Sequence, residues 1–184
     1  INAGRNKRSI TPLCYAVRFI YLETVKALIG VVANNKSVDL NPEDGAGWTP
    51  IRHAAALGET PIVEALVSAK ADLKRYYEHK STLLHCVIKT KKQGPSAKLE
   101  IIESLLKGDV YLEQRDNDRN TALHVAVKRG MLPIVQLLVE KQADLNSQGE
   151  NESTALHLAT ESTDIVSVRY LLEKGADPNL RNIQ

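Results

Sequence analysis

Aromatic residues and cysteines are scarce in this sequence. Aromatic residues make up 4% of the chain and hydrophobic residues 43%, so Leu, Ile, Val and Ala must fill the core. The two cysteines, Cys14 and Cys86, fall inside helical patterns and lack the spacing of a disulfide or a zinc site. We therefore predict that both are small buried residues in a reducing compartment.

Charge excess, long apolar runs and catalytic motifs are also missing. The formal net charge of +2 gives no general attraction to nucleic acid or anionic membranes. No apolar run approaches the roughly 20 residues that span a bilayer. The sequence has no Gly-x-Ser-x-Gly, no phosphate-binding glycine loop, no His-Glu-x-x-His and no Cys-x-x-Cys. We predict no enzyme activity, cofactor or metal site within these residues, no nucleic-acid partner and no membrane insertion.

What the chain does contain is one segment copied five times. Residues 121–126 read Thr-Ala-Leu-His-Val-Ala, and a near-identical copy begins 33 residues later at Thr154. Weaker copies begin at Thr82, Thr49 and Thr11, and their spacings to the next copy are 39, 33 and 38 residues. Five copies in phase indicate a repeat architecture.

The residues after each copy predict two short amphipathic helices. In the fourth copy, apolar residues three and four apart run to Arg129 and resume after Pro133. Gly130 suits the end of the first helix, and Pro133 suits the first turn of the second. Helices this short are marginal alone in water, so neighbouring repeats must stabilise them.

This signature and its 33-residue period resemble the ankyrin repeat, whose consensus is Thr-Pro-Leu-His-x-Ala. The resemblance covers nearly the whole chain and implies an all-α solenoid of stacked helix-turn-helix units joined by β-hairpin-like loops. It implies a single domain over residues 1–184, with repeats at about 7–44, 45–77, 78–116, 117–149 and 150–182. Neither end resembles a polar capping repeat, so we expect a piece of a longer protein.

The first three repeats depart from the pattern. Repeat one has five extra residues, which we place within 30–38. In repeat two, Arg52 stands at the position of the signature histidine. In repeat three, six extra residues fall within 89–98, where Gly94 and Pro95 should break a helix. We predict a mobile basic loop there.

Three histidines recur at the signature position, which at first suggests a metal site. His85, His124 and His157 each follow a threonine by three residues at a predicted helix start. The Thr hydroxyl and the imidazole can therefore pair locally, while the second ring nitrogen reaches a backbone group of the adjacent repeat. We predict that these histidines join repeats and bind no metal.

The resemblance also implies which residues face a partner. In the family these are the hairpin residues just before the signature Thr and the last exposed residues of the first helix. Carried over by phase, the partner-binding residues are Ile10, Arg18, Phe19, Trp48, Leu57, Tyr76, Tyr77, Lys89, Lys128 and Arg129. An apolar cluster is expected from Ile10, Phe19, Trp48 and Leu57, and a basic ridge from Arg18, Lys89, Lys128 and Arg129. The alternatives are that Trp48 packs over the next hairpin and that the ridge is an ordinary solvated face.

The sequence therefore predicts a scaffold that binds another protein or peptide in the concave groove of the array. The expected partner carries an apolar anchor and acidic residues. The alternative is a substrate-recruiting or regulatory ankyrin domain of a larger enzyme, or of a secreted microbial effector acting in a host cell. We expect a cytoplasmic location, or the host cytosol for an effector.

Overall fold

The computed structural model describes residues 10–30 and 38–183, and these contain ten α-helices and no β-strand. The all-α prediction is therefore confirmed. The chain divides into two compact units, residues 1–77 with 90–109, and residues 78–89 with 110–184. Most of the segment expected to hold the extra residues of repeat one lies outside the described residues.

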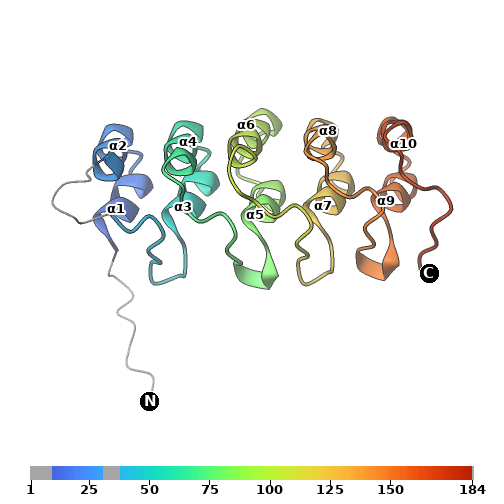
Figure 1. Ribbon diagram of the computed structural model, residues 1–184, viewed down its shortest axis with the longest axis horizontal. Helices are drawn as coiled ribbons and strands as arrows, with labels where there is room; N and C mark the ends of the chain where they lie inside the picture. The colour runs from blue at the N-terminus through green and yellow to red at the C-terminus, as the bar shows by residue number, and fades with distance from the viewer. Residues whose placement is uncertain (1–9, 31–37, 184) are drawn as a thin grey trace, which may run out of the picture. The chain divides into compact units, whose positions relative to one another are not determined.

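The first unit contains five helices in two rows. They are α1 (Pro12–Arg18), α2 (Leu22–Gly30), α3 (Pro50–Leu57), α4 (Thr60–Ser68) and α6 (Pro95–Leu105). α1 lies beside α3, while α4 lies between α2 and α6 in the second row (Figure 1). Fully buried Ile51, Leu66 and Ile101 fill the space between the rows with aliphatic side chains. Burial of these side chains drives the packing.

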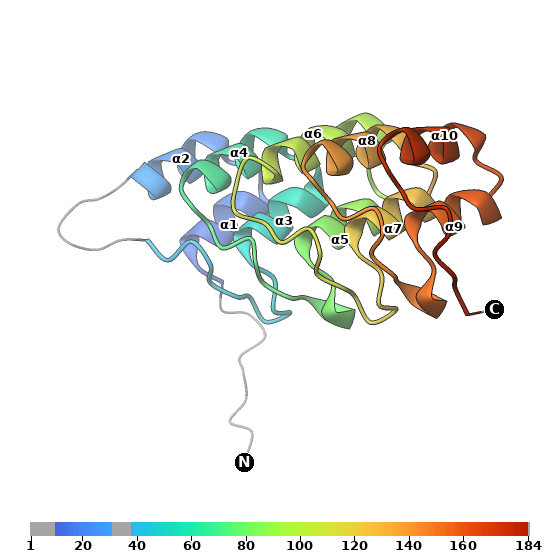
Figure 2. The same ribbon diagram turned by 45° about the vertical axis from the view of Figure 1, so that its right-hand side comes forward.

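The second unit repeats this arrangement. Its helices are α5 (Leu83–Lys89), α7 (Ala122–Lys128), α8 (Leu132–Glu140), α9 (Ala155–Glu161) and α10 (Ile165–Glu173). α7 packs between α5 and α9, and α8 and α10 lie side by side in a second row, drawn above them in Figure 2. Leu84, Leu123 and Leu138 are buried between these helices.

The signature threonine begins the first helix of a repeat. Thr11, Thr49 and Thr154 are N-cap residues whose side-chain oxygens accept the backbone N–H three residues later. This bond satisfies one of the N–H groups that a helix start leaves without a partner, and such a cap contributes about 1 kcal/mol. The strict return of Thr in the sequence thus marks the start of each first helix.

Two of the three signature histidines, His85 and His124, connect neighbouring repeats as predicted, whereas His157 pairs with Thr154 of its own repeat. The Nδ1 atom of His85 lies 2.8 Å from the hydroxyl of Thr82, and its Nε2 lies 2.9 Å from the carbonyl oxygen of Asn120. His124 pairs in the same way with Thr121 (2.7 Å) and with the carbonyl oxygen of Ser153 (3.1 Å). Since a carbonyl only accepts, Nε2 carries the proton, and Nδ1 accepts from the threonine hydroxyl.

The connections between repeats are tight turns in the described part of the chain. Asp44 N–H bonds to the carbonyl of Trp48 at 3.1 Å, and Gly149 N–H bonds to that of Ser153 at 2.8 Å. Short 3₁₀ turns occupy Glu78–Lys80 and Glu150–Glu152. The predicted hairpin-like loops therefore exist as turns.

Repeat three differs from its prediction. Lys89 ends α5 and Lys98 lies within α6, so the connection between these helices is only residues 90–94. Lys98 is almost fully buried, and its ammonium donates a 2.6 Å hydrogen bond to the carbonyl oxygen of Thr90. The prediction of a basic loop over 89–98 is therefore wrong in extent, because Gly94 and Pro95 begin a helix here instead of breaking one.

Candidate functional site

The first unit has five exposed apolar side chains on α1, on the turn that follows α1, and at the C-terminal end of α3. They form what we call the aromatic patch, and they are Tyr15, Phe19, Ile20, Tyr21 and Leu57. Each remains between 45% and 52% exposed. The rings of Tyr15 and Phe19 lie 4.5 Å apart, and those of Phe19 and Tyr21 lie 6.1 Å apart and stacked. Clusters of exposed large apolar side chains mark interaction surfaces.

Phe19 and Leu57 are equivalent residues of repeats one and two. Each follows the signature threonine by eight residues, at the C-terminal end of α1 or α3. α1 and α3 are in contact, so the patch extends across two repeats. Sequence reasoning selected these two residues but missed Tyr15, Ile20 and Tyr21, which lie beside Phe19.

Ile20 adopts an unusual backbone conformation for its residue type. Its φ angle is +61°, in the left-handed region that β-branched residues rarely enter. Repeats two and four have a glycine at the same position, Gly58 and Gly130, each with positive φ. An isoleucine held in this conformation with its side chain exposed suggests a role other than stability.

Trp48 belongs to a different arrangement. The guanidinium of Arg52 lies 4.1 Å from the Trp48 ring centroid and 4.5 Å from that of Tyr77. The hydroxyl of Tyr77 also lies 3.0 Å from that of Thr49. Arg52, which replaces the signature histidine, is thus buried between two aromatic rings. Trp48 and Tyr77 thus pack around Arg52, an arrangement that the sequence alternatives for Trp48 did not include.

The predicted apolar cluster is therefore wrong in composition. Ile10 and Trp48 precede the N-terminal ends of α1 and α3, whereas Phe19 and Leu57 lie at their C-terminal ends. A helix of seven or eight residues is about 11 Å long, which separates the two pairs. Tyr76, in the same unit, is exposed but lies outside the aromatic patch as defined.

The predicted basic ridge is largely neutralised. The ammonium of Lys89 lies 2.6 Å from the carboxylate of Asp116, and that of Lys128 lies 2.8 Å from Glu150. Burial alone would raise the pKa of Asp116, but hydrogen bonds from Lys89 and from the backbone of Asn120 lower that pKa overall. Arg129 in this unit and Arg18 in the first are exposed. The ridge thus loses two of its four expected charges.

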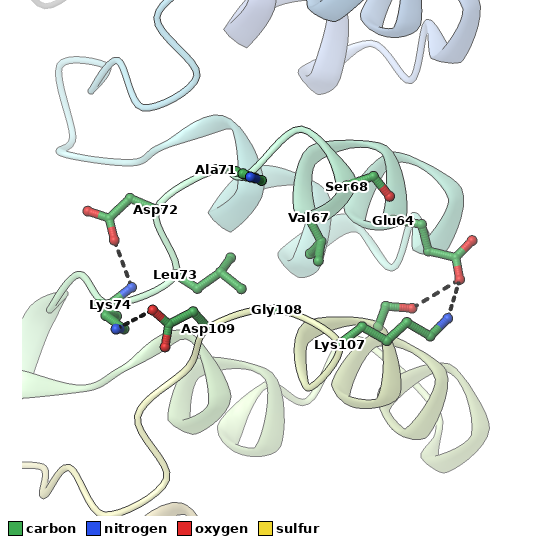
Figure 3. A pocket seen from close by; sticks show the side chains of 12 residues that line it. Glu64, Val67, Ser68, Ala71, Asp72, Leu73, Lys74, Lys107, Gly108 and Asp109 are labelled. Carbon is green, nitrogen blue, oxygen red and sulfur yellow. Dashed lines mark hydrogen bonds and ion pairs between the residues drawn. The ribbon is translucent and has the colours of Figure 1, made fainter.

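A crevice of about 850 Å³ lies between the C-terminal ends of α4 and α6 (Figure 3). Val67 and Leu73 line it, and ion pairs of Lys107 with Glu64 and of Lys74 with Asp109 lie beside them. A crevice at the corresponding position of the second unit measures about 420 Å³. These paired charges suggest a structural junction and form no arrangement for catalysis.

The difference between the two crevices has a local cause. In three places, a side-chain oxygen in the segment after the second helix of one repeat accepts the backbone N–H of an aspartate in the next repeat. The pairs are Asn41 with Asp72, Glu113 with Asp144, and Asn146 with Asp177. The aspartate at the corresponding position of repeat three is Asp109, and it faces Lys74. The side chain of Lys74 cannot accept a hydrogen bond, and its ammonium pairs with the carboxylate of Asp109 instead. We attribute the wider crevice to this missing hydrogen bond.

Other chemistry has little support within the described residues. No group of three or more His, Cys, Asp or Glu side chains in that part of the chain can hold a metal ion. Among those residues no helix combines the length and apolar character needed to cross a membrane. Cys14 and Cys86 form no disulfide with each other, and Cys14 is buried as predicted while Cys86 is partly exposed. Burial raises the pKa of the Cys14 thiol, which makes it unreactive.

Stacked helix pairs, threonine caps and histidine bonds between repeats define the class of helical repeat proteins. The family model described as ankyrin repeats matches residues 1–77 and 84–182, and the chain belongs to the ankyrin-repeat family. Members of this family are generally protein–protein interaction modules. The chain is also 31% identical over 106 residues to alpha-latrotoxin-Lhe1a of Latrodectus hesperus. That match covers 57% of this chain but 7% of the toxin.

Proposed function

We propose that this chain binds a polypeptide partner through the aromatic patch of the first unit. The observation that carries the proposal is Ile20, an exposed isoleucine in a left-handed conformation beside stacked Phe19 and Tyr21. Glycine, which enters the left-handed region without strain, occupies this position in repeats two and four, and Thr163 occupies it in repeat five. The proposed partner contributes apolar side chains that cover Phe19 and Leu57.

The composition of the patch favours a protein ligand. Interface hot spots are rich in aromatic residues, which bury a large area with little loss of side-chain freedom. At the equivalent ends of α7 and α9, the second unit exposes Arg129 and Ser162 instead of large apolar residues. We therefore place the main apolar contact on the first two repeats.

The experiment begins with selection of binding peptides from a random display library on the full chain. The affinity of each selected peptide is then measured for the wild type and for a Phe19→Ser and Leu57→Ser double variant. Loss of the two apolar contacts should weaken binding by roughly 2 kcal/mol or more. An Ile165→Ser variant, which changes an exposed apolar residue of α10, is the control. Equal affinity of all three proteins would refute the patch as the binding site.

A second candidate is that these repeats serve as the targeting part of a larger secreted protein. The chain is similar to a segment that makes up 7% of a toxin, and this similarity favours the targeting role over the enzyme-linked alternative. In that case the partner lies in a target cell and not in the cytosol of the producing cell. Sequencing of the complete gene tests the idea, since a secretory signal would support it and a gene without one would count against it. A cytosolic location remains the proposal for a chain made without such a signal.

A further inference from the structure

The connection between α5 and α6 carries two lysines to the aromatic patch. The side-chain amide of Gln93 donates to the carbonyl oxygen of Ala55, near the C-terminal end of α3. A Cβ atom at Gly58 would lie only 3.6 Å from the Gln93 side chain, so residues 90–94 lie against the turn that follows Leu57. All of these residues belong to the first unit. Lys91 and Lys92 directly precede Gln93, whose side chain contacts the turn after Leu57.

Both ends of this connection are held by hydrogen bonds. The buried ammonium of Lys98 donates to the carbonyl oxygen of Thr90, and the N–H of Lys92 donates to the Thr90 hydroxyl at 3.3 Å. Together with Gln93, these bonds fix the backbone that carries the two lysines. An ordered backbone reduces the conformational entropy lost when a ligand binds.

The charges of these lysines are available to a ligand. Lys91 and Lys92 are exposed, and neither is paired with a carboxylate in the described part of the chain. Their situation differs from that of Lys89 and Lys128, whose ion pairs neutralise them. Arg18 adds a third positive charge next to Phe19, and Glu59 adds one negative charge on the turn after Leu57. The surroundings of the patch are thus positive overall.

We infer that the partner is an acidic peptide segment, in which apolar residues that cover the aromatic patch are followed by Asp or Glu residues that face Lys91 and Lys92. This inference rests on the proposed function and names the chemistry of its ligand. It replaces the predicted basic ridge with a pair of lysines that repeat three alone supplies, through its longer connection. Opposite charges at the rim of an interface accelerate association and select among partners that share an apolar anchor.

The test uses one peptide selected on the full chain, in its native form and with every Asp and Glu changed to Asn and Gln. Both forms are titrated against the wild type and a Lys91→Glu and Lys92→Glu double variant. A Lys70→Glu and Lys141→Glu variant, which reverses two exposed lysines elsewhere, controls for net charge. We expect the Lys91 and Lys92 reversal to weaken the native peptide about ten-fold at low salt and less at high salt. The neutral peptide should not respond.

The outcomes separate this inference from the proposed function. If the Phe19 and Leu57 variant loses the peptide but the Lys91 and Lys92 reversal does not, the patch binds and the acidic specificity is wrong. If selected peptides lack acidic residues, the inference also fails. If neither variant affects binding, both proposals fail. Circular dichroism and thermal unfolding of each variant establish that a lost affinity does not come from a lost fold.

Discussion

The imidazole of His124 bonds to the backbone of the following repeat, with Nε2 lying 3.1 Å from the carbonyl oxygen of Ser153. His85 makes the same bond to Asn120. Both rings are buried and neutral, and each joins two layers of the second unit. Protonation of Nδ1 would remove the lone pair that accepts the backbone N–H of Thr82 or Thr121, so this hydrogen bond would be lost.

Acid should therefore destabilise the fold through these histidines. Burial lowers the pKa of His85 and of His124 below the ordinary histidine value of 6.5. The unfolded chain then binds protons before the folded chain does, so the free energy of unfolding is constant above about pH 6.5 and falls below it. Urea unfolding between pH 7.5 and 5 measures this. The lowered pKa values of Asp44 and Asp116 reduce stability only as the pH falls below about 5, so they do not interfere. A flat profile would show that the rings titrate normally.

Lys74→Asn should strengthen the junction between α4 and α6. Asparagine supplies the acceptor that Asn41 and Asn146 provide elsewhere, here for the N–H of Asp109. One such hydrogen bond adds about 1 kcal/mol to the free energy of unfolding, and the exposed ion pair that is lost contributes less. Lys74→Met, which has similar length but no such acceptor, is the control and should bring no gain. Equal stability of both variants would contradict the missing-bond explanation of the crevice.

Ile20→Gly should stabilise the protein while it weakens binding. Glycine relieves the left-handed strain at +61°, for a net gain of roughly 1 kcal/mol after its greater freedom in the unfolded chain. Thr163→Gly, at the equivalent position of repeat five with φ of +54°, should stabilise without an effect on peptide affinity. Thermal unfolding and peptide titration of both variants give the two readouts. An Ile20→Gly variant that binds fully would remove Ile20 from the interface.

Lys89→Ala should reduce stability, although its position was predicted to face a partner. The substitution leaves the buried carboxylate of Asp116 without its cation. The Lys89 side chain is 34% exposed, so solvent screening reduces the loss to about 1–2 kcal/mol. Arg129→Ala, on an exposed residue, should change the free energy of unfolding by less than about 0.5 kcal/mol. Similar denaturation midpoints for the two variants would mean that the Lys89 ion pair contributes little.

Trp48→Ala should also act on the fold. Removing the ring exposes the guanidinium of Arg52 on one side and destabilises the protein by about 2 kcal/mol. Trp48→Phe keeps an aromatic face and should recover most of that loss. Peptide affinity should remain unchanged in both variants, because Trp48 lies outside the aromatic patch. Weakened affinity in a stably folded Trp48→Ala protein would return Trp48 to the binding site.

The family and the helix pairs could be predicted from the sequence because they depend on local chemistry. A threonine that caps a helix, a histidine three residues later and a stripe of aliphatic residues recur at a fixed period. Phe19 and Leu57 could be predicted for the same reason, because their position within the repeat assigns them to the exposed end of the first helix. Phase gives no information on where individual side chains pair. The loss of Lys89 and Lys128 from the basic ridge therefore became visible only with Asp116 and Glu150 in place.

The sequence by itself determined that this is an ankyrin-repeat protein, because the period and the capping residues act within one repeat. Tertiary structure decided which of the positions expected to face a partner remain available for binding. Arg52 draws Trp48 and Tyr77 into packing, and Gln93 brings Lys91 and Lys92 to the turn after Leu57. The contacts of Arg52 with Tyr77 and of Gln93 with Ala55 join residues 25 and 38 positions apart. A pattern that repeats every 33 residues cannot specify contacts formed where the repeats differ.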